Sequence, residues 1–95
     1  MIPWKVRKAA YVEHIRGAPS GAKAISCADK IHNMQSLLLA LDRGAAAWAQ
    51  LSAPPEAQIE RFDALRTALA EGWEHPMLQQ YDRILGKLKG RLPKG

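Results

Sequence analysis

Asp29 and Asn33 are the polar residues of this sequence whose types and spacing best suit ligand chemistry. They are four residues apart within a long helical pattern over about residues 22–42, so they share one arc of the helix. We expect this arc to look inward, because its other members are small: Ala22, Ser26, Ser36 and Ala40. A divalent metal would satisfy Asp29, since burying an unpaired carboxylate is costly. The alternatives are an ion pair with Arg7 or Lys8 and an exposed helical acid.

His32 lies three residues after Asp29, so both side chains could approach one ion from adjacent turns. However, the helix turns His32 about 60° away from Asp29. We therefore expect His32 to pack or to orient its neighbours rather than to bind the metal. A catalytic metal site needs about three protein ligands and a position left for water, so Asp29 alone would hold an ion weakly.

The candidate residues for binding a substrate are Asn33, Lys30, Arg7 and Lys8. The Asn33 amide can both donate and accept hydrogen bonds, but it could equally be buried and bonded to backbone. Arg7 and Lys8 lie on a first predicted helix, from which they could reach a phosphate or form a solvated basic turn. Lys30 could supply charge to a phosphate or simply be solvated.

The order of these residues resembles a known family. The run Ser26-Cys-Ala-Asp29-Lys-Ile-His-Asn-Met34 is similar to a segment of the HD superfamily of metal-dependent phosphohydrolases, above all of RelA/SpoT-type guanosine tetraphosphate hydrolase domains and their small stand-alone relatives. Three other landmarks follow the same order: Trp4-x-x-Arg7-Lys8-x-x-Tyr11, Gly44-x-x-x-Trp48 and His75-Pro76-Met77. Together they cover about residues 4–85. The resemblance implies an HD-like helical fold and a divalent metal such as manganese, with Asp29 as one ligand. It also implies a nucleotide facing Asn33.

The family's other metal ligands, a His and a later His-Asp pair, precede this segment and have no counterpart, since the sequence contains no His-Asp dipeptide. Gln35 stands where the hydrolases usually have Arg, which removes a positive charge suited to phosphate. The sequence therefore resembles the C-terminal half of an HD domain, as a fragment, a truncated product or a degenerate descendant. We expect it to be inactive alone. The alternative is a non-enzymatic helical module that binds a protein partner or an anionic ligand.

The elements that must position these residues are helices. Helical spacing and the Pro and Gly breaks predict segments at about 4–16, 22–42, 45–51, 56–71 and 77–88, with His75-Pro76 opening the last one. No segment alternates like a strand. The prediction is an all-α fold, a small bundle of about five helices in one domain over residues 1–95, with a frayed basic tail at 87–95. The second helix should face the core with Cys27, Ile31, Met34, Leu38 and Leu41.

Composition narrows the possible partners. The net charge of +5 suits an anionic ligand such as a nucleotide or phosphate. The sequence does not favour a nucleic-acid partner, because the Trp and Tyr residues fall on core-like faces rather than among basic residues. The single cysteine, Cys27, fits a reducing cytoplasm, and no apolar run approaches the length of a membrane span. Apolar faces left without cover would favour self-association.

Overall fold

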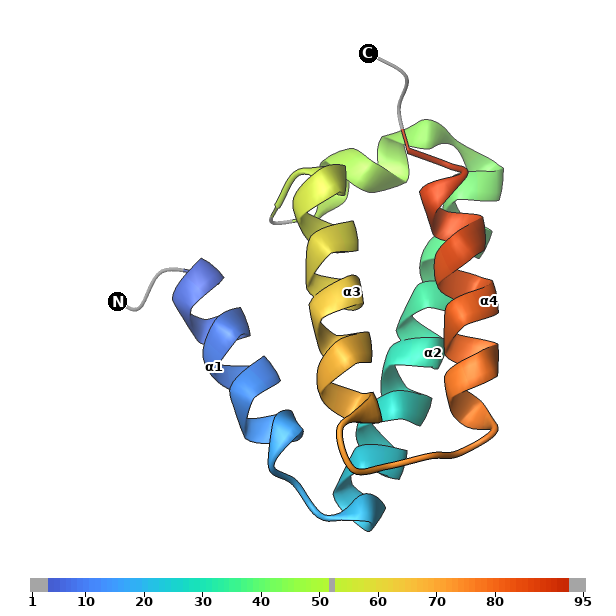
Figure 1. Ribbon diagram of the computed structural model, residues 1–95. Helices are drawn as coiled ribbons and strands as arrows, with labels where there is room; N and C mark the ends of the chain where they lie inside the picture. The colour runs from blue at the N-terminus through green and yellow to red at the C-terminus, as the bar shows by residue number, and fades with distance from the viewer. Residues whose placement is uncertain (1–3, 52, 93–95) are drawn as a thin grey trace.

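The computed structural model describes residues 4–51 and 53–92, without the side chains of residues 4–8 and 45. The chain forms four α-helices and one 3₁₀ segment, and the described part contains no strand (Figure 1). In chain order the elements are α1 (Trp4–Arg16), α2 (Ser20–Arg43), η1 (Ala45–Gln50), α3 (Pro55–Ala70) and α4 (Met77–Lys89). This confirms the predicted all-α bundle. The third of the five expected helices is the 3₁₀ segment.

Proline and glycine set the helix boundaries much as the sequence predicts. Pro19 precedes α2 in extended backbone, and Pro55 occupies the first turn of α3, where a missing N–H costs nothing. Gly72 reverses the chain after α3 with φ of +71°, a left-handed conformation that favours glycine. Before α4, the His75 ring stacks on Trp73 and its Nδ1 accepts a hydrogen bond of 3.1 Å from the Met77 N–H. His75 therefore helps α4 to begin.

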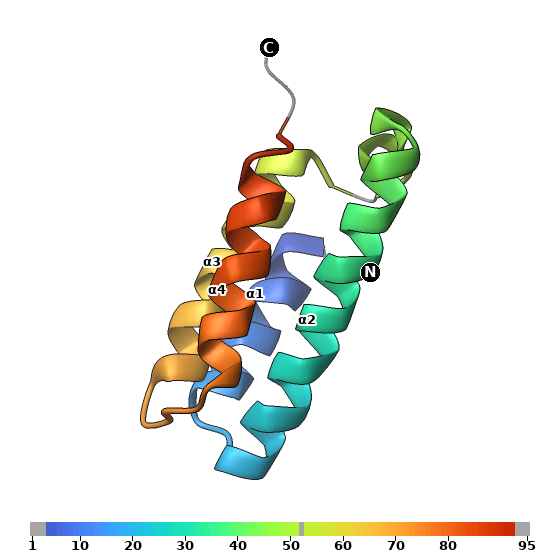
Figure 2. The same cartoon turned by 90° about the vertical axis from the view of Figure 1, so that its right-hand side faces the viewer.

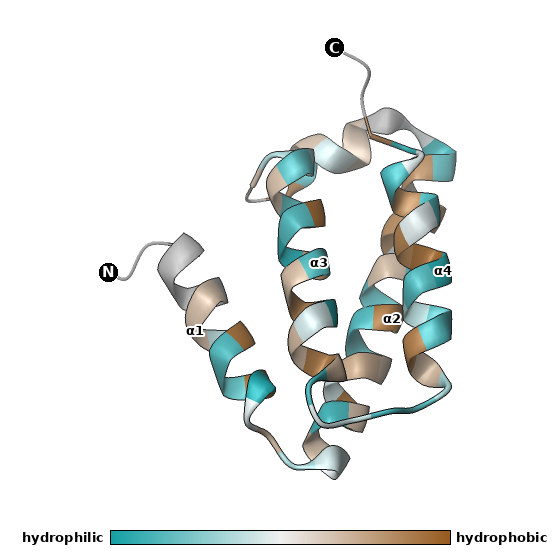
Figure 3. Ribbon diagram, in the orientation of Figure 1, coloured by the Kyte–Doolittle hydropathy of each residue, from teal (hydrophilic) through white to brown (hydrophobic). Residues whose placement is uncertain are grey.

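The helices pack as two linked pairs. α2 packs on α4 and on η1, α1 packs on α3, and α3 also contacts α4 (Figures 1 and 2). Hydrophobic residues recur along α2, α3 and α4 at helical spacing, as the hydropathy colouring in Figure 3 shows. The largest fully buried side chains come from these three helices: Cys27, Met34, Leu65, Leu69, Tyr81 and Leu88. The core-facing stripe predicted for α2 is confirmed, with Leu38 half-buried at its edge.

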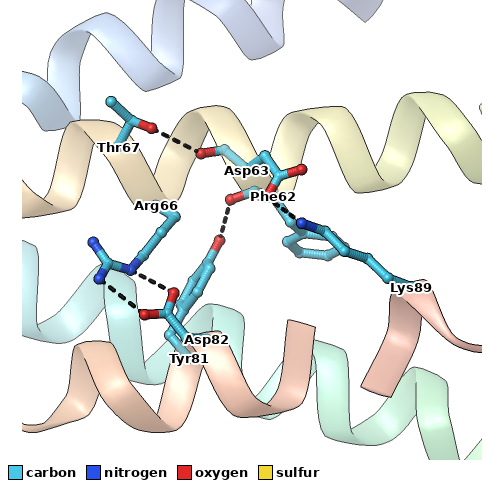
Figure 4. Close-up of polar contacts among 7 residues, drawn as sticks. All are labelled: Phe62, Asp63, Arg66, Thr67, Tyr81, Asp82 and Lys89. Atoms are coloured by element: carbon cyan, nitrogen blue, oxygen red, sulfur yellow. Dashed lines mark hydrogen bonds and ion pairs between the residues drawn. The ribbon is translucent and has the colours of Figure 1, made fainter. Parts of the chain in front are cut away.

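Polar contacts join α3 to α4 around a buried tyrosine (Figure 4). The Tyr81 hydroxyl donates a 2.8 Å hydrogen bond to the Phe62 carbonyl, and burial raises the pKa of Tyr81 well above its usual value. On the surface, Arg66 donates two hydrogen bonds of 2.7 and 2.9 Å to the carboxylate of Asp82. The same two helices are therefore held by one buried bond and by a bidentate ion pair at the rim.

Buried Lys23 fastens the beginning of α2 to the end of α3, because its ammonium donates to the Glu71 carbonyl just beyond the last turn of α3. A cation at a helix C-terminus also interacts favourably with the helix dipole. The Glu71 side chain accepts a 2.6 Å hydrogen bond from Arg16, at the end of α1. Three helices thus meet at this end of the bundle.

The basic tail is more ordered than the sequence predicts. Leu88 is fully buried, α4 continues to Lys89, and the Arg91 guanidinium pairs with Asp42 at 2.6 Å. The Trp48 indole N–H donates a 3.1 Å hydrogen bond to the Arg91 carbonyl. The predicted fraying is therefore wrong for residues 87–92, because apolar burial and these contacts hold the segment; residues 93–95 lie outside the described part. Within the ranges described above, none of the helices combines the length and apolar character needed to cross a lipid bilayer.

Candidate functional site

Asp29 lies on the exposed face of α2. Its side chain is 59% exposed, and its Oδ2 is 3.5 Å from the Nζ of Lys30, the next residue. Most of the arc expected to look inward is exposed as well, namely Ala22, Asn33, Ser36 and Ala40; Ser26 alone of that arc is buried. The expectation of an inward-looking arc is therefore wrong. The side of α2 that packs on the core carries Cys27, Ile31 and Met34. Because the Asp29 arc lies on another side of the helix, it faces solvent.

Lys30 is held between α1 and α2 rather than directed outward. Its side chain is 14% exposed, and its ammonium lies 5.3 Å from the centroid of the Tyr11 ring. The Tyr11 hydroxyl is hydrogen bonded to the Ser26 Oγ at 2.7 Å, which fixes the ring over the lysine. The ammonium therefore already has an aromatic face and the Asp29 carboxylate as partners. Its role toward a substrate stays a prediction.

His32 is exposed on α2, so the expectation that it packs against neighbours is wrong. Among the described residues, no three His, Cys, Asp or Glu side chains gather closely enough to hold a metal ion. Asp29, with a lysine as its ion-pair partner, does not by itself form a metal site. The predicted manganese-type ion and the orienting role of His32 therefore stay predictions. Arg7 and Lys8 lie on α1, but their side chains fall outside the described residues.

Asn33, one helical turn after Asp29, lies on the wall of a cavity of about 460 Å³ between α2, η1 and α3. The lining comes from all three segments: Asn33, Ser36, Leu37, Ala40, Ala47, Gln50, Leu51, Gln58, Arg61 and Phe62. Neither Asp29 nor Lys30 belongs to it. The cavity wall therefore includes the predicted nucleotide-facing amide and not the predicted metal ligand, although the two are neighbours on α2.

Arg61 is the cavity residue that the sequence did not single out. Its side chain is half-buried, and its Nε is enclosed without a hydrogen-bond partner among the described residues. The guanidinium carbon is 5.0 Å from the centroid of the Phe62 ring, and burial lowers the pKa of Arg61. An arginine remains charged even so. Arg61 lies beside buried Ile59 and Phe62, at the edge of the core face of α3. This position next to two core residues is the feature of the sequence that could have indicated a partly buried arginine.

A second cavity, of about 430 Å³, lies near the end of α4 and is lined by Leu38, Asp42, Lys87, Gly90 and Arg91. Here the guanidinium of Arg91 is already neutralised by Asp42 at 2.6 Å. Lys87 is the other cation of this lining, and it is exposed to solvent, whereas Arg61 is half-buried.

The sequence matches no known protein-family model, and no curated protein matches it. The motifs quoted above are thus the whole basis of the resemblance to HD phosphohydrolases.

We expect Asp29→Asn to change the free energy of unfolding by less than about 0.5 kcal/mol, because an exposed ion pair between neighbouring residues contributes little. Urea denaturation followed by circular dichroism would measure the change. Asp82→Asn is the matched comparison, since Asp82 accepts two hydrogen bonds from Arg66 and should cost more. A loss for Asp29→Asn as large as that for Asp82→Asn would contradict the exposed position of Asp29.

Proposed function

We propose that this chain is a partial HD-type phosphohydrolase domain of the nucleotide and pyrophosphate hydrolase lineage, and that it does not hydrolyse phosphoesters on its own. The motif order from Trp4 to Met77 and the all-α architecture support the lineage. The proposed lack of activity rests on one observation, that the Asp29 side chain is exposed and forms an ion pair with Lys30. Metal-assisted hydrolysis requires an ion held by several ligands beside a substrate pocket, so no hydrolytic step is assigned to this chain.

A second candidate function is a non-enzymatic helical module that binds an anionic ligand. It is favoured by the cavity that contains Arg61, because this guanidinium has no carboxylate partner among the described residues. Self-association has weaker support. The strongly exposed apolar residues of α2, Ile25 and Leu39, lie about 21 Å apart along the helix and do not form one patch.

The test of the first candidate is a turnover assay of the purified chain with added Mn²⁺, using guanosine tetraphosphate, a nucleoside triphosphate and p-nitrophenyl phosphate. We expect no phosphate release above the blank from the wild type or from Asp29→Ala. Electron paramagnetic resonance should show the signal of free Mn²⁺ unchanged by the protein, because one exposed carboxylate holds the ion weakly. Metal-dependent turnover that Asp29→Ala abolishes would refute the inactivity and strengthen the lineage.

A further inference from the structure

Arg61 is half-buried and forms no ion pair among the described residues, whereas Arg43 and Arg83, which also form none there, are exposed. Arg16, Arg66 and Arg91 each reach a carboxylate within 2.7 Å. Among the described residues Arg61 reaches none, although it is half-buried and its Nε is closed off from solvent. A buried donor without a partner costs free energy, and such groups in folded proteins call for an explanation. The enclosed Nε cannot itself meet a ligand, so the observation that points to an anion is the absence of a carboxylate partner for this guanidinium among the described residues.

The cavity beside Arg61 has the chemistry of an anion site. Its described lining contains no Asp or Glu, so no carboxylate of that lining competes with an anion for the guanidinium. Asn33, Ser36, Gln50 and Gln58 provide neutral hydrogen-bond donors on the same walls. The volume of about 460 Å³ lies within the range of small-molecule sites.

The remaining walls are apolar. Leu37, Leu51 and Phe62 line the cavity together with two alanines. A ligand that fits such walls carries an anionic group at one end and a flat or apolar moiety at the other. A planar, forked guanidinium suits phosphate in particular, because it can donate two parallel hydrogen bonds.

We propose that the cavity between α2, η1 and α3 binds a small organic phosphate of about the size of a nucleoside monophosphate, with Arg61 holding the phosphate. This site uses neither Asp29 nor a metal, so it is separate from the phosphohydrolase proposal; it rests on the second candidate function and names the ligand class of that module. The two can also fail separately: turnover with Mn²⁺ tests Asp29, whereas metal-free binding tests Arg61. Arg61 is assigned here as a binding residue.

The experiment is a titration of the full chain with adenosine 5′-monophosphate at low salt, without metal, by isothermal titration calorimetry and by ¹⁵N nuclear magnetic resonance. Adenosine serves as the uncharged comparison. We expect saturable binding of the monophosphate, much weaker binding of adenosine, and shift changes at the amides around Asn33, Ser36 and Arg61. Absence of binding at millimolar monophosphate, equal binding of adenosine, or shift changes confined to α4 would overturn the proposal.

Variants of matched charge locate the binding on Arg61. Arg61→Gln should weaken monophosphate binding by at least about tenfold, because charged hydrogen bonds are among the strongest polar contacts. Arg83→Gln makes the same charge change on the exposed face of α4 and should leave the affinity within about twofold. Arg61→Lys keeps the charge without the fork and should fall between the two. Equal affinities of Arg61→Gln and the wild type would overturn the proposal.

Folding of the variant can be judged independently. Arg61→Gln removes an enclosed donor that has no partner among the described residues, so its melting temperature should match or exceed that of the wild type. A melting temperature that stays the same or rises while affinity falls would mark Arg61 as a residue kept for binding. A fall in melting temperature without a fall in affinity would mark it as structural and would overturn the proposal.

Discussion

Replacing Tyr81 by Ala is expected to lower the free energy of unfolding by about 3–5 kcal/mol, since it removes a fully buried aromatic ring and leaves a cavity. This is a large share of the stability of a small domain, which is about 5–15 kcal/mol. The ring fills the space between α3 and α4, and its hydroxyl reaches the Phe62 carbonyl (Figure 4). Urea denaturation followed by circular dichroism measures the loss.

Tyr81→Phe is the matched control, because it keeps the ring and removes only the hydroxyl. We expect it to cost about 0.5–1.5 kcal/mol, the usual net contribution of one hydrogen bond. The difference between the two variants then gives the contribution of the ring. If Tyr81→Phe destabilised the protein as much as Tyr81→Ala, packing of the ring would not be the main stabilising contact.

Met34→Ala is expected to lower the free energy of unfolding by about 2–5 kcal/mol, because Met34 is fully buried on the core face of α2. The neighbouring substitution Gln35→Ala is its control. Gln35 is exposed on the same helix, so we expect a change of less than about 0.5 kcal/mol. Similar losses for both would mean that α2 is rotated about its axis, which would also alter the exposure assigned to Asp29.

The sequence predicts most of the helices because their signals are local. Pro19, Pro55 and Gly72 interrupt the chain wherever they occur, and apolar residues at helical spacing mark the buried side of each helix. The conformation of the segment after Gly44 is harder to predict from the sequence. Its alanines favour helix, but it spans only Ala45–Gln50 between breaks and winds as a 3₁₀ segment. Which helices pack together depends on contacts between distant residues, and the sequence pattern does not contain them.

The candidate site is less predictable for the same reason. A helical wheel gives the angle between Asp29 and Met34 around the axis of α2. It does not say whether another helix covers the side of α2 that carries Asp29. That side is exposed in the described structure, so the small residues around Asp29 face solvent. Arg61 was missed because the enclosure of its Nε comes from tertiary packing. Asn33 was singled out from the sequence, and it does line a cavity, though not one that it shares with Asp29.

The bond from the Trp48 indole to the Arg91 carbonyl links two parts of the chain that are 43 residues apart. Trp48 belongs to η1, and neighbouring residues of the same short segment, Ala47 and Gln50, form one wall of the cavity beside Arg61. Trimming the polypeptide back past Arg91 would therefore loosen that wall at a distance. Proteolysis at this point would disturb the cavity beside Arg61, although neither Arg91 nor Leu92 is among its described lining residues.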